Sequence, residues 1–75
     1  MNVCIGFKKI TSKKDGAVYY DIFYTYEDKY VNGQACDHVF ISASNVNNSD
    51  ALTPGAIIDV AYNRFGRSDR VTVLW

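Results

Sequence analysis

The stretch AVYYDIFYTY, residues 17–26, decides the fold class of this chain. It is rich in aromatic and β-branched residues and contains nothing that starts a helix, so it predicts a β-strand. One face of that strand is uniformly apolar and is predicted to face the core: Val18, Tyr20, Ile22, Tyr24 and Tyr26. The other face is mixed and is predicted to face outward: Ala17, Tyr19, Asp21, Phe23 and Thr25. A one-residue bulge would exchange the two faces.

Four other segments also have the composition of strands, and turn signals separate them. They span residues 2–10, 34–42, 56–62 and 69–75. Asp15-Gly16 and Asn32-Gly33 are hairpin signals, and NRFG at 63–66 predicts a short turn with Gly66 in the left-handed region. Residues 43–55, ASNVNNSDALTPG, have no long amphipathic pattern. We expect a loop or one short helical turn there.

Alternation within the outer strands predicts which side chains lie together on one face. The first strand is expected to group Val3, Ile5 and Phe7. The fourth is expected to group Ile58, Val60 and Tyr62, and the fifth Val71, Val73 and Trp75. In the third strand, Val39 and Ile41 share one face, and His38 and Phe40 share the other.

The 75 residues are therefore expected to form a single all-β domain, residues 1–75. Five strands with one irregular element between the third and the fourth fit a small antiparallel barrel. The order of elements, the aromatic second strand and the stretch LTPGAIIDVAYNRFGRSDRVTVL, residues 52–74, resemble a minimal OB-fold module. The chain also resembles small uncharacterised proteins of the single-strand nucleic-acid-binding type from phages and mobile elements of Gram-positive bacteria. An SH3-like barrel shares much of this pattern and stays open as an alternative.

The positive charges are concentrated although the formal net charge is zero. Seven of the eight basic residues lie in or beside two predicted loops: Lys8, Lys9, Lys13 and Lys14 at one, and Arg64, Arg67 and Arg70 at the other. In an OB-fold these two loops flank the face that binds oligonucleotides. A protein that binds a single strand needs cations that contact the phosphates and flat side chains that stack on the bases.

These patterns predict a non-enzymatic module that binds single-stranded nucleic acid through basic loops and exposed aromatic residues. The candidate binding residues are Lys8, Lys9, Lys13, Lys14, Tyr19, Phe23, His38, Phe40, Arg64, Phe65 and Arg67. Phe65 is either inserted against a base or packed back across the barrel mouth. Asp21 counts against the hypothesis, because a carboxylate on the proposed platform repels phosphate.

A second hypothesis from another class is a protein-interaction module, an accessory factor of a phage or mobile element that docks a partner through the aromatic face. Tyrosine, phenylalanine and arginine dominate protein interfaces as well, and the balanced net charge suits this class. Under the first hypothesis the chain is expected to act as a homodimer or a higher oligomer, and under the second the aromatic face docks either a partner chain or a second copy.

No catalytic constellation and no phosphate-binding glycine loop can be placed, so we expect no enzymatic activity and no cofactor. Cys4, Cys36 and His38 are too few to close a zinc site, and we expect two reduced thiols and no metal. No apolar run approaches the roughly 18 residues of a membrane helix. The first residues show no signal-peptide pattern, which predicts a cytoplasmic location.

Overall fold

The computed structural model describes residues 2–75 and is all-β. Its elements are β1 (Asn2–Thr11), β2 (Val18–Tyr26), β3 (Ala35–Ser42), the 3-10 turn η1 (Ala43–Asn45), β4 (Val46–Asn47), the 3-10 turn η2 (Ser49–Ala51), β5 (Ile57–Tyr62) and β6 (Ser68–Val73). The five predicted strands are confirmed to within two residues at each end. The predicted helical turn is confirmed as two short 3-10 turns, and the two-residue β4 between them was not expected.

The strands form one sheet with the order β3-β2-β1-β5-β6-β4. Three consecutive strands lie side by side, and β5 returns after a long connection to pair with the start of β1. This is the Greek-key arrangement, and a partly open Greek-key barrel of five long strands is the form that the OB-fold-like expectation requires. The order therefore favours that expectation over the SH3-like alternative.

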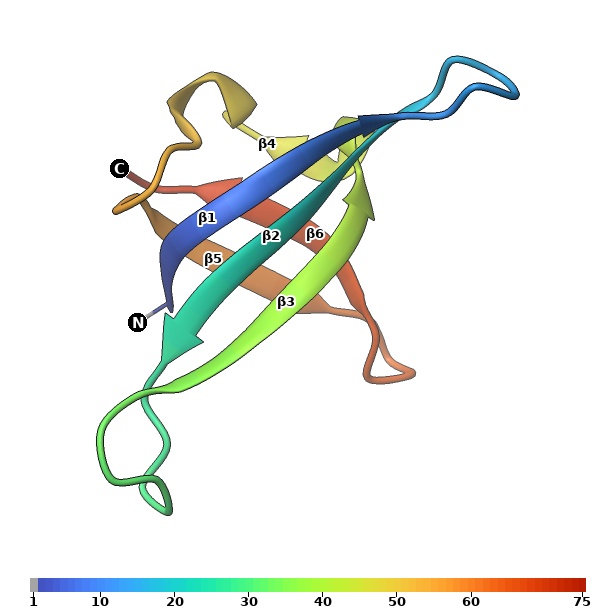
Figure 1. Ribbon diagram of the computed structural model, residues 1–75. Coiled ribbons are helices and arrows are strands. Elements are labelled where there is room, and N and C mark those ends of the chain that lie inside the picture. The colour runs from blue at the N-terminus through green and yellow to red at the C-terminus, as the bar shows by residue number, and fades with distance from the viewer. Residues whose placement is uncertain (1) are drawn as a thin grey trace.

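The sheet is open, and the chain itself, not a hydrogen-bonded pairing, connects its two edge strands. β3 and β4 are the two edges of the sheet, yet only the three residues of η1 separate them in sequence. β4 pairs in parallel with β6. Because β4 follows β3 so closely, the sheet has to curl until β6 lies near the end of β3. In Figure 1, β1, β2 and β3 accordingly pass in front of β5 and β6. The face of these three strands that is turned toward the viewer is the outside of the barrel.

The core lies between these two layers and contains no buried polar side chain among residues 2–75. The apolar face predicted for β2 is confirmed, since Ile22 is fully buried, Tyr24 is 4% exposed, and Tyr20 and Tyr26 pack against the core. The buried residues are Cys4, Ile22, Tyr24, Val39, Ile41, Val46, Leu52, Ala56, Ile58, Val60, Val71 and Val73.

A β-bulge in β1 overturns the grouping expected for that strand. The register with β2 shifts between Cys4 and Gly6, so that Ile5 has no partner across the ladder. Cys4 consequently enters the core, whereas Ile5 is 55% exposed. The prediction that Val3, Ile5 and Phe7 share one face is therefore wrong, because one extra residue reverses the alternation beyond it.

A second register shift lies between Ala61 and Tyr62, where β5 pairs with β6. Ile58 and Val60 are buried as predicted, but Tyr62 is 59% exposed. In the last strand Val71 and Val73 are buried as predicted, whereas Trp75 lies beyond the end of β6 and is 73% exposed. Tyr62 keeps the side of β5 on which Ile58 and Val60 lie, because the skipped residue of this pairing is Asp69 in β6. The expectation that Trp75 extends the apolar row of the last strand is wrong.

Replacing Ile22 by alanine tests this core. Because the side chain is fully buried at the centre of β2, we expect Ile22→Ala to lower the free energy of unfolding by about 2–5 kcal/mol in chemical denaturation. Ile5→Ala makes the same change at the exposed bulge and is expected to cost under about 1 kcal/mol. Equal losses in the two variants would contradict the observed register of β1 and β2.

Candidate nucleic-acid interface

The outward face of β2 and β3 carries five of the residues that matter for the candidate site. Residues opposite one another in an antiparallel pair project from the same face, and Phe23 lies opposite His38 while Asp21 lies opposite Phe40. Tyr19 belongs to the same face, two residues before Asp21. We call these five residues the outer platform. The outward orientation predicted for Tyr19 and Phe23 is confirmed.

The platform contains two stacked pairs of flat side chains. Tyr19 and Phe40 have ring centroids 5.4 Å apart at an interplanar angle of 16°, and Phe23 and His38 are 5.5 Å apart at 22°. In each pair the β2 ring is half-buried and the β3 ring is exposed, with Phe40 56% exposed and the His38 side chain 57% exposed. One face of each β3 ring rests on its partner, so its opposite face is open to solvent.

Asp21 lies between the two pairs and is tied to His38. Its Oδ1 is 2.8 Å from His38 Nδ1, and its side chain is only 14% exposed. Lys8 of β1 stands directly opposite Asp21 on the other side of β2. The carboxylate is thus turned toward a ring nitrogen and has a lysine opposite it in β1, which weakens the repulsion of phosphate that the sequence suggested.

The loop between β1 and β2 is a tight turn that holds its lysines outward. Ser12 and Ala17 close it through a 2.7 Å backbone hydrogen bond, and the Gly16 amide donates to the Ser12 carbonyl at 2.9 Å. Asp15 Oδ1 accepts a hydrogen bond from the Ala17 amide at 3.0 Å. This bond, together with Ser12, holds the pKa of the Asp15 carboxyl below its usual value. Lys13 and Lys14 are exposed at the tip.

Asn63 organises the loop between β5 and β6. Its side-chain Oδ1 accepts hydrogen bonds from the amides of Phe65, at 2.9 Å, and Arg67, at 3.1 Å. Its backbone bonds to Arg67 and to Gly66 complete the turn. Gly66 has a φ of 78°, which confirms the left-handed conformation predicted there. The five residues 63–67 therefore form a defined turn that presents its remaining side chains outward.

Phe65 does not pack back across the barrel mouth. It is 73% exposed, and the Arg64 guanidinium lies 5.0 Å from the centre of its ring. Arg67 and Arg70 are exposed as well. A flat apolar ring and three guanidinium groups are thus available at one tip of the molecule.

Both basic loops project from the right-hand side of the barrel in Figure 1, one above and one below the right-hand part of β3. Of the two lysines in β1, Lys8 shares the outer face, whereas Lys9 lies opposite Tyr20 and projects from the other face of the strand. The outer face therefore carries Lys8 with the platform, the two basic loops extend from the same end of the barrel, and Lys9 is separated from the outer face. The acidic residues of the β2–β3 loop, Glu27 and Asp28, lie at the opposite end.

Two residues that support this surface were not identified from the sequence. Ile10 lies opposite Tyr19 and is 37% exposed, so it extends the platform onto β1. For Asn63 the sequence predicts only a place in the NRFG turn. Asparagine at the first position of a turn is a known signal, because its side chain accepts hydrogen bonds from amides further along the chain.

The two cysteines lie in different environments. Both are free; Cys4 is buried, which raises the pKa of its thiol, and Cys36 is exposed. Cys36 lies opposite Thr25 on the outer face, whereas Cys4 lies opposite Tyr24 on the inner face. Across the described residues 2–75 no cluster of three or more histidine, cysteine or acidic side chains could hold a metal ion. No helix in the same range is long and apolar enough to cross a membrane.

No protein-family model, no curated protein and no solved structure matches this chain significantly.

The role of Asn63 can be tested by removing its side-chain acceptor. Asn63→Ala leaves the amides of Phe65 and Arg67 without a protein partner, so we expect a loss of about 1 kcal/mol in unfolding free energy and faster hydrogen exchange at both amides. Asn63→Asp keeps an acceptor oxygen and is the matched control. Unchanged exchange in the alanine variant would show that the side chain does not hold the loop.

Proposed function

We propose that this protein is a non-enzymatic module that binds single-stranded nucleic acid across the outer platform, between its two basic loops. The observation that carries the proposal is the pair of stacks Tyr19–Phe40 and Phe23–His38, in which each β3 ring has one face supported and one face free. A ring already held by its neighbour loses little conformational entropy when a base stacks on its open face.

The two basic loops supply the positive charges that the outer platform lacks. In this proposal the phosphates of a strand lying across the platform contact Lys13 and Lys14 of one loop and Arg64 and Arg67 of the other, all four of which are exposed. Arginine also stacks on bases, and Phe65 adds a third ring beyond the platform. Each stacked base contributes about 1–3 kcal/mol in sites of this kind.

The zero net charge is compatible with this function because the charges are segregated. Asp15 bonds to the backbone of its own loop and Asp21 bonds to His38, so these two carboxylates have partners. Asp69 is exposed beside Arg67 and Arg70, where three arginines outnumber it. Glu27 and Asp28 lie at the far end of the barrel. The local field at the platform is therefore set by lysine and arginine more than by the sum over the chain.

The proposed mode predicts weak sequence preference and a preference for single strands. Stacking on Phe40 and His38 needs bases whose faces are free, and these are hidden in a duplex. The platform offers two supported rings, so one chain covers only a few nucleotides. Several copies of this chain then bind side by side along a longer strand, and in this proposal that is how the protein acts as an oligomer.

The first test is fluorescence anisotropy of a labelled 20-nucleotide oligo-dT, titrated with the protein at low and high salt. We expect salt-dependent binding that is stronger than binding to a duplex of the same length. Arg67→Glu is expected to weaken binding roughly five- to tenfold at low salt and to reduce the salt dependence. Lys29→Glu makes the same change of charge in the β2–β3 loop and is expected to leave affinity nearly unchanged.

Stacking is tested separately from charge. Phe65→Ala and Phe40→Ala are each expected to cost about 1–3 kcal/mol of binding free energy if a base rests on the ring. Tyr30→Ala removes an aromatic side chain that is 85% exposed in the β2–β3 loop and serves as the matched control. Absence of binding at low salt and tens of micromolar protein, or equal effects of Phe65→Ala and Tyr30→Ala, would contradict the proposal.

A protein-docking role is the second candidate, and one observation favours it. Ile10 and Phe40 are exposed on the same outer face, on either side of Tyr19, and such apolar clusters occur at protein interfaces. Under this function Phe40→Ala would abolish association with the partner or with a second copy, whereas Arg67→Glu would have little effect. The ratio of these two effects separates the two functions.

A further inference from the structure

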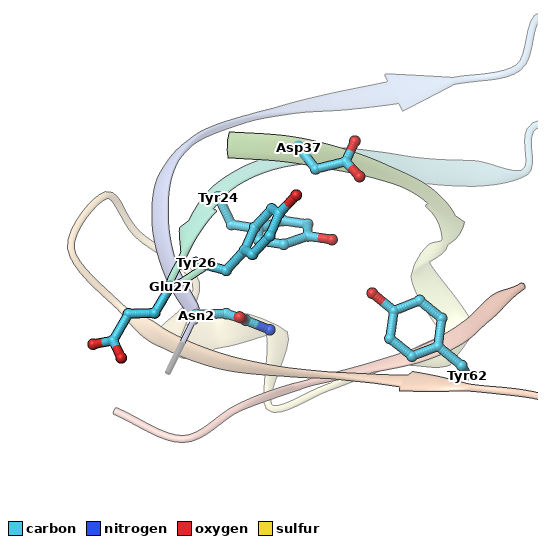
Figure 2. Close-up of a pocket in the computed structure, with 6 residues that line it drawn as sticks. All are labelled: Asn2, Tyr24, Tyr26, Glu27, Asp37 and Tyr62. Carbon is cyan, nitrogen blue, oxygen red and sulfur yellow. The ribbon is translucent and has the colours of Figure 1, made fainter. Parts of the chain in front are cut away.

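A pocket of about 370 Å³ opens at one end of the barrel, on the opposite side of the sheet from the outer platform. Figure 2 shows the residues that line it: Asn2, Tyr24, Tyr26, Glu27, Asp37 and Tyr62. They come from the start of β1, the end of β2, the start of β3 and the end of β5. The volume lies at the lower end of the range for sites that bind small molecules.

Asp37 lies at the mouth of the barrel. It lies opposite Tyr24 in the same alternating row of β3 as Val39 and Ile41, which are both buried, but Asp37 itself is exposed. Its carboxylate can therefore contact both solvent and a ligand in the pocket.

Among residues 2–75 the charge of Asp37 has no cationic partner. Its Oδ1 accepts a 2.7 Å hydrogen bond from the His38 amide, and no lysine or arginine in that range lies within salt-bridge distance of it. None of the residues that line the pocket is a lysine or an arginine. Glu27 adds a second carboxylate at the rim, directed away from the rings in Figure 2. The lining residues therefore give the pocket a negative charge.

Three tyrosines form the rest of the wall. Tyr24 is 4% exposed, and in Figure 2 its hydroxyl extends toward Tyr62, whose hydroxyl points back at it. The Tyr24 and Tyr26 rings are 6.1 Å apart and tilted by 47°. Burial, together with the nearby Tyr62 hydroxyl, raises the pKa of Tyr24 far above its usual value, so this phenol stays neutral. The wall thus combines aromatic surface with hydroxyl oxygens that accept hydrogen bonds.

We propose that this pocket binds an organic cation that carries N–H donors, namely a guanidinium or primary alkylammonium group with its aliphatic stem. Asp37 is the counter-ion, the tyrosine hydroxyls and the Asn2 carbonyl are the additional acceptors, and the rings of Tyr24, Tyr26 and Tyr62 contact the stem and the cation. Aromatic rings attract cations through their faces, and carboxylates form their strongest hydrogen bonds with charged N–H groups. The abundance of oxygen acceptors favours such a cation over a quaternary ammonium, which has no N–H to donate.

This site is separate from the proposed nucleic-acid interface. Asp37 and His38 are neighbours in β3 and project from opposite faces of the sheet, so a strand on the outer platform does not fill the pocket. A test with a small cation in the absence of nucleic acid therefore addresses the pocket alone.

The test is a titration of the ¹⁵N-labelled protein with n-butylguanidinium, followed by amide chemical shifts. We expect saturable shifts centred on Tyr24, Asp37 and Tyr62, and none with valeramide, a neutral amide of similar length. Asp37→Asn should weaken binding about tenfold or more, because it removes the charge that pairs with the guanidinium. Asp59→Asn makes the same change at an exposed position of β5 outside the pocket and should leave affinity unchanged.

Tyr62→Ala provides a second variant at a side chain that is 59% exposed, where the substitution does not disturb the core. It should weaken binding about threefold through loss of one aromatic wall. Unchanged affinity in either pocket variant, equal shifts with valeramide, or no shifts at tens of millimolar n-butylguanidinium would overturn the proposal.

A blocked Gly-Arg-Gly peptide distinguishes the source of the cation. Binding as tight as that of n-butylguanidinium indicates a protein arginine, and much weaker binding indicates a free small molecule.

Discussion

The alternation of β2 between two faces is the constraint on which the rest of the structure depends. β2 is hydrogen-bonded along its length to β1 on one side and to β3 on the other, so its register places the side chains of both neighbours. Ile22 and Tyr24 enter the core, while Tyr19, Asp21 and Phe23 form the outer platform. A slip of one residue would bury Asp21 and expose Ile22, and the cost of burying that charge keeps the register unique.

The same alternation gives the β1–β2–β3 sheet opposite chemistry on its two faces. Outside, stacked rings lie on the side from which the lysine and arginine loops project, which suits an anionic partner. Inside, at one end of the barrel, Asp37 and three tyrosines line one pocket, which suits a cationic partner. His38 belongs to the outer platform and Asp37 to the pocket. Because they are adjacent in β3, they project from opposite faces of the sheet, and the sheet lies between the two sites. The two proposed sites can therefore be occupied independently.

Local hydrogen bonds rather than core packing hold the two basic loops in place. Asn63 accepts from two amides of its loop, and Asp15 and Ser12 bond within theirs. Turns closed in this way present charged side chains with little loss of backbone freedom on binding. The loops can thus carry function although almost none of their side chains contributes to the core.

The sequence by itself determined the strands, most turns and the facing of β2. These depend on residue types close together in the chain: the aromatic and β-branched run of residues 17–26, Gly66 after Arg64-Phe65, and the Pro54-Gly55 step before β5. It also identified the rings of the platform, because alternation in β2 and β3 is uninterrupted.

Only the tertiary structure decided the features that depend on pairing between distant segments. The bulge at Ile5 and the register shift before Tyr62 depend on how β1 meets β2 and how β5 meets β6. Gly6 is a local sign of a bulge in β1, but it does not show which residue is left unpaired. The bond between Asp21 and His38 and the gathering of Tyr24, Asp37 and Tyr62 around one pocket follow from the same registers. A period-two pattern shows that a residue lies on one of two faces, but a single inserted residue reverses that assignment, and its position is set by the partner strand.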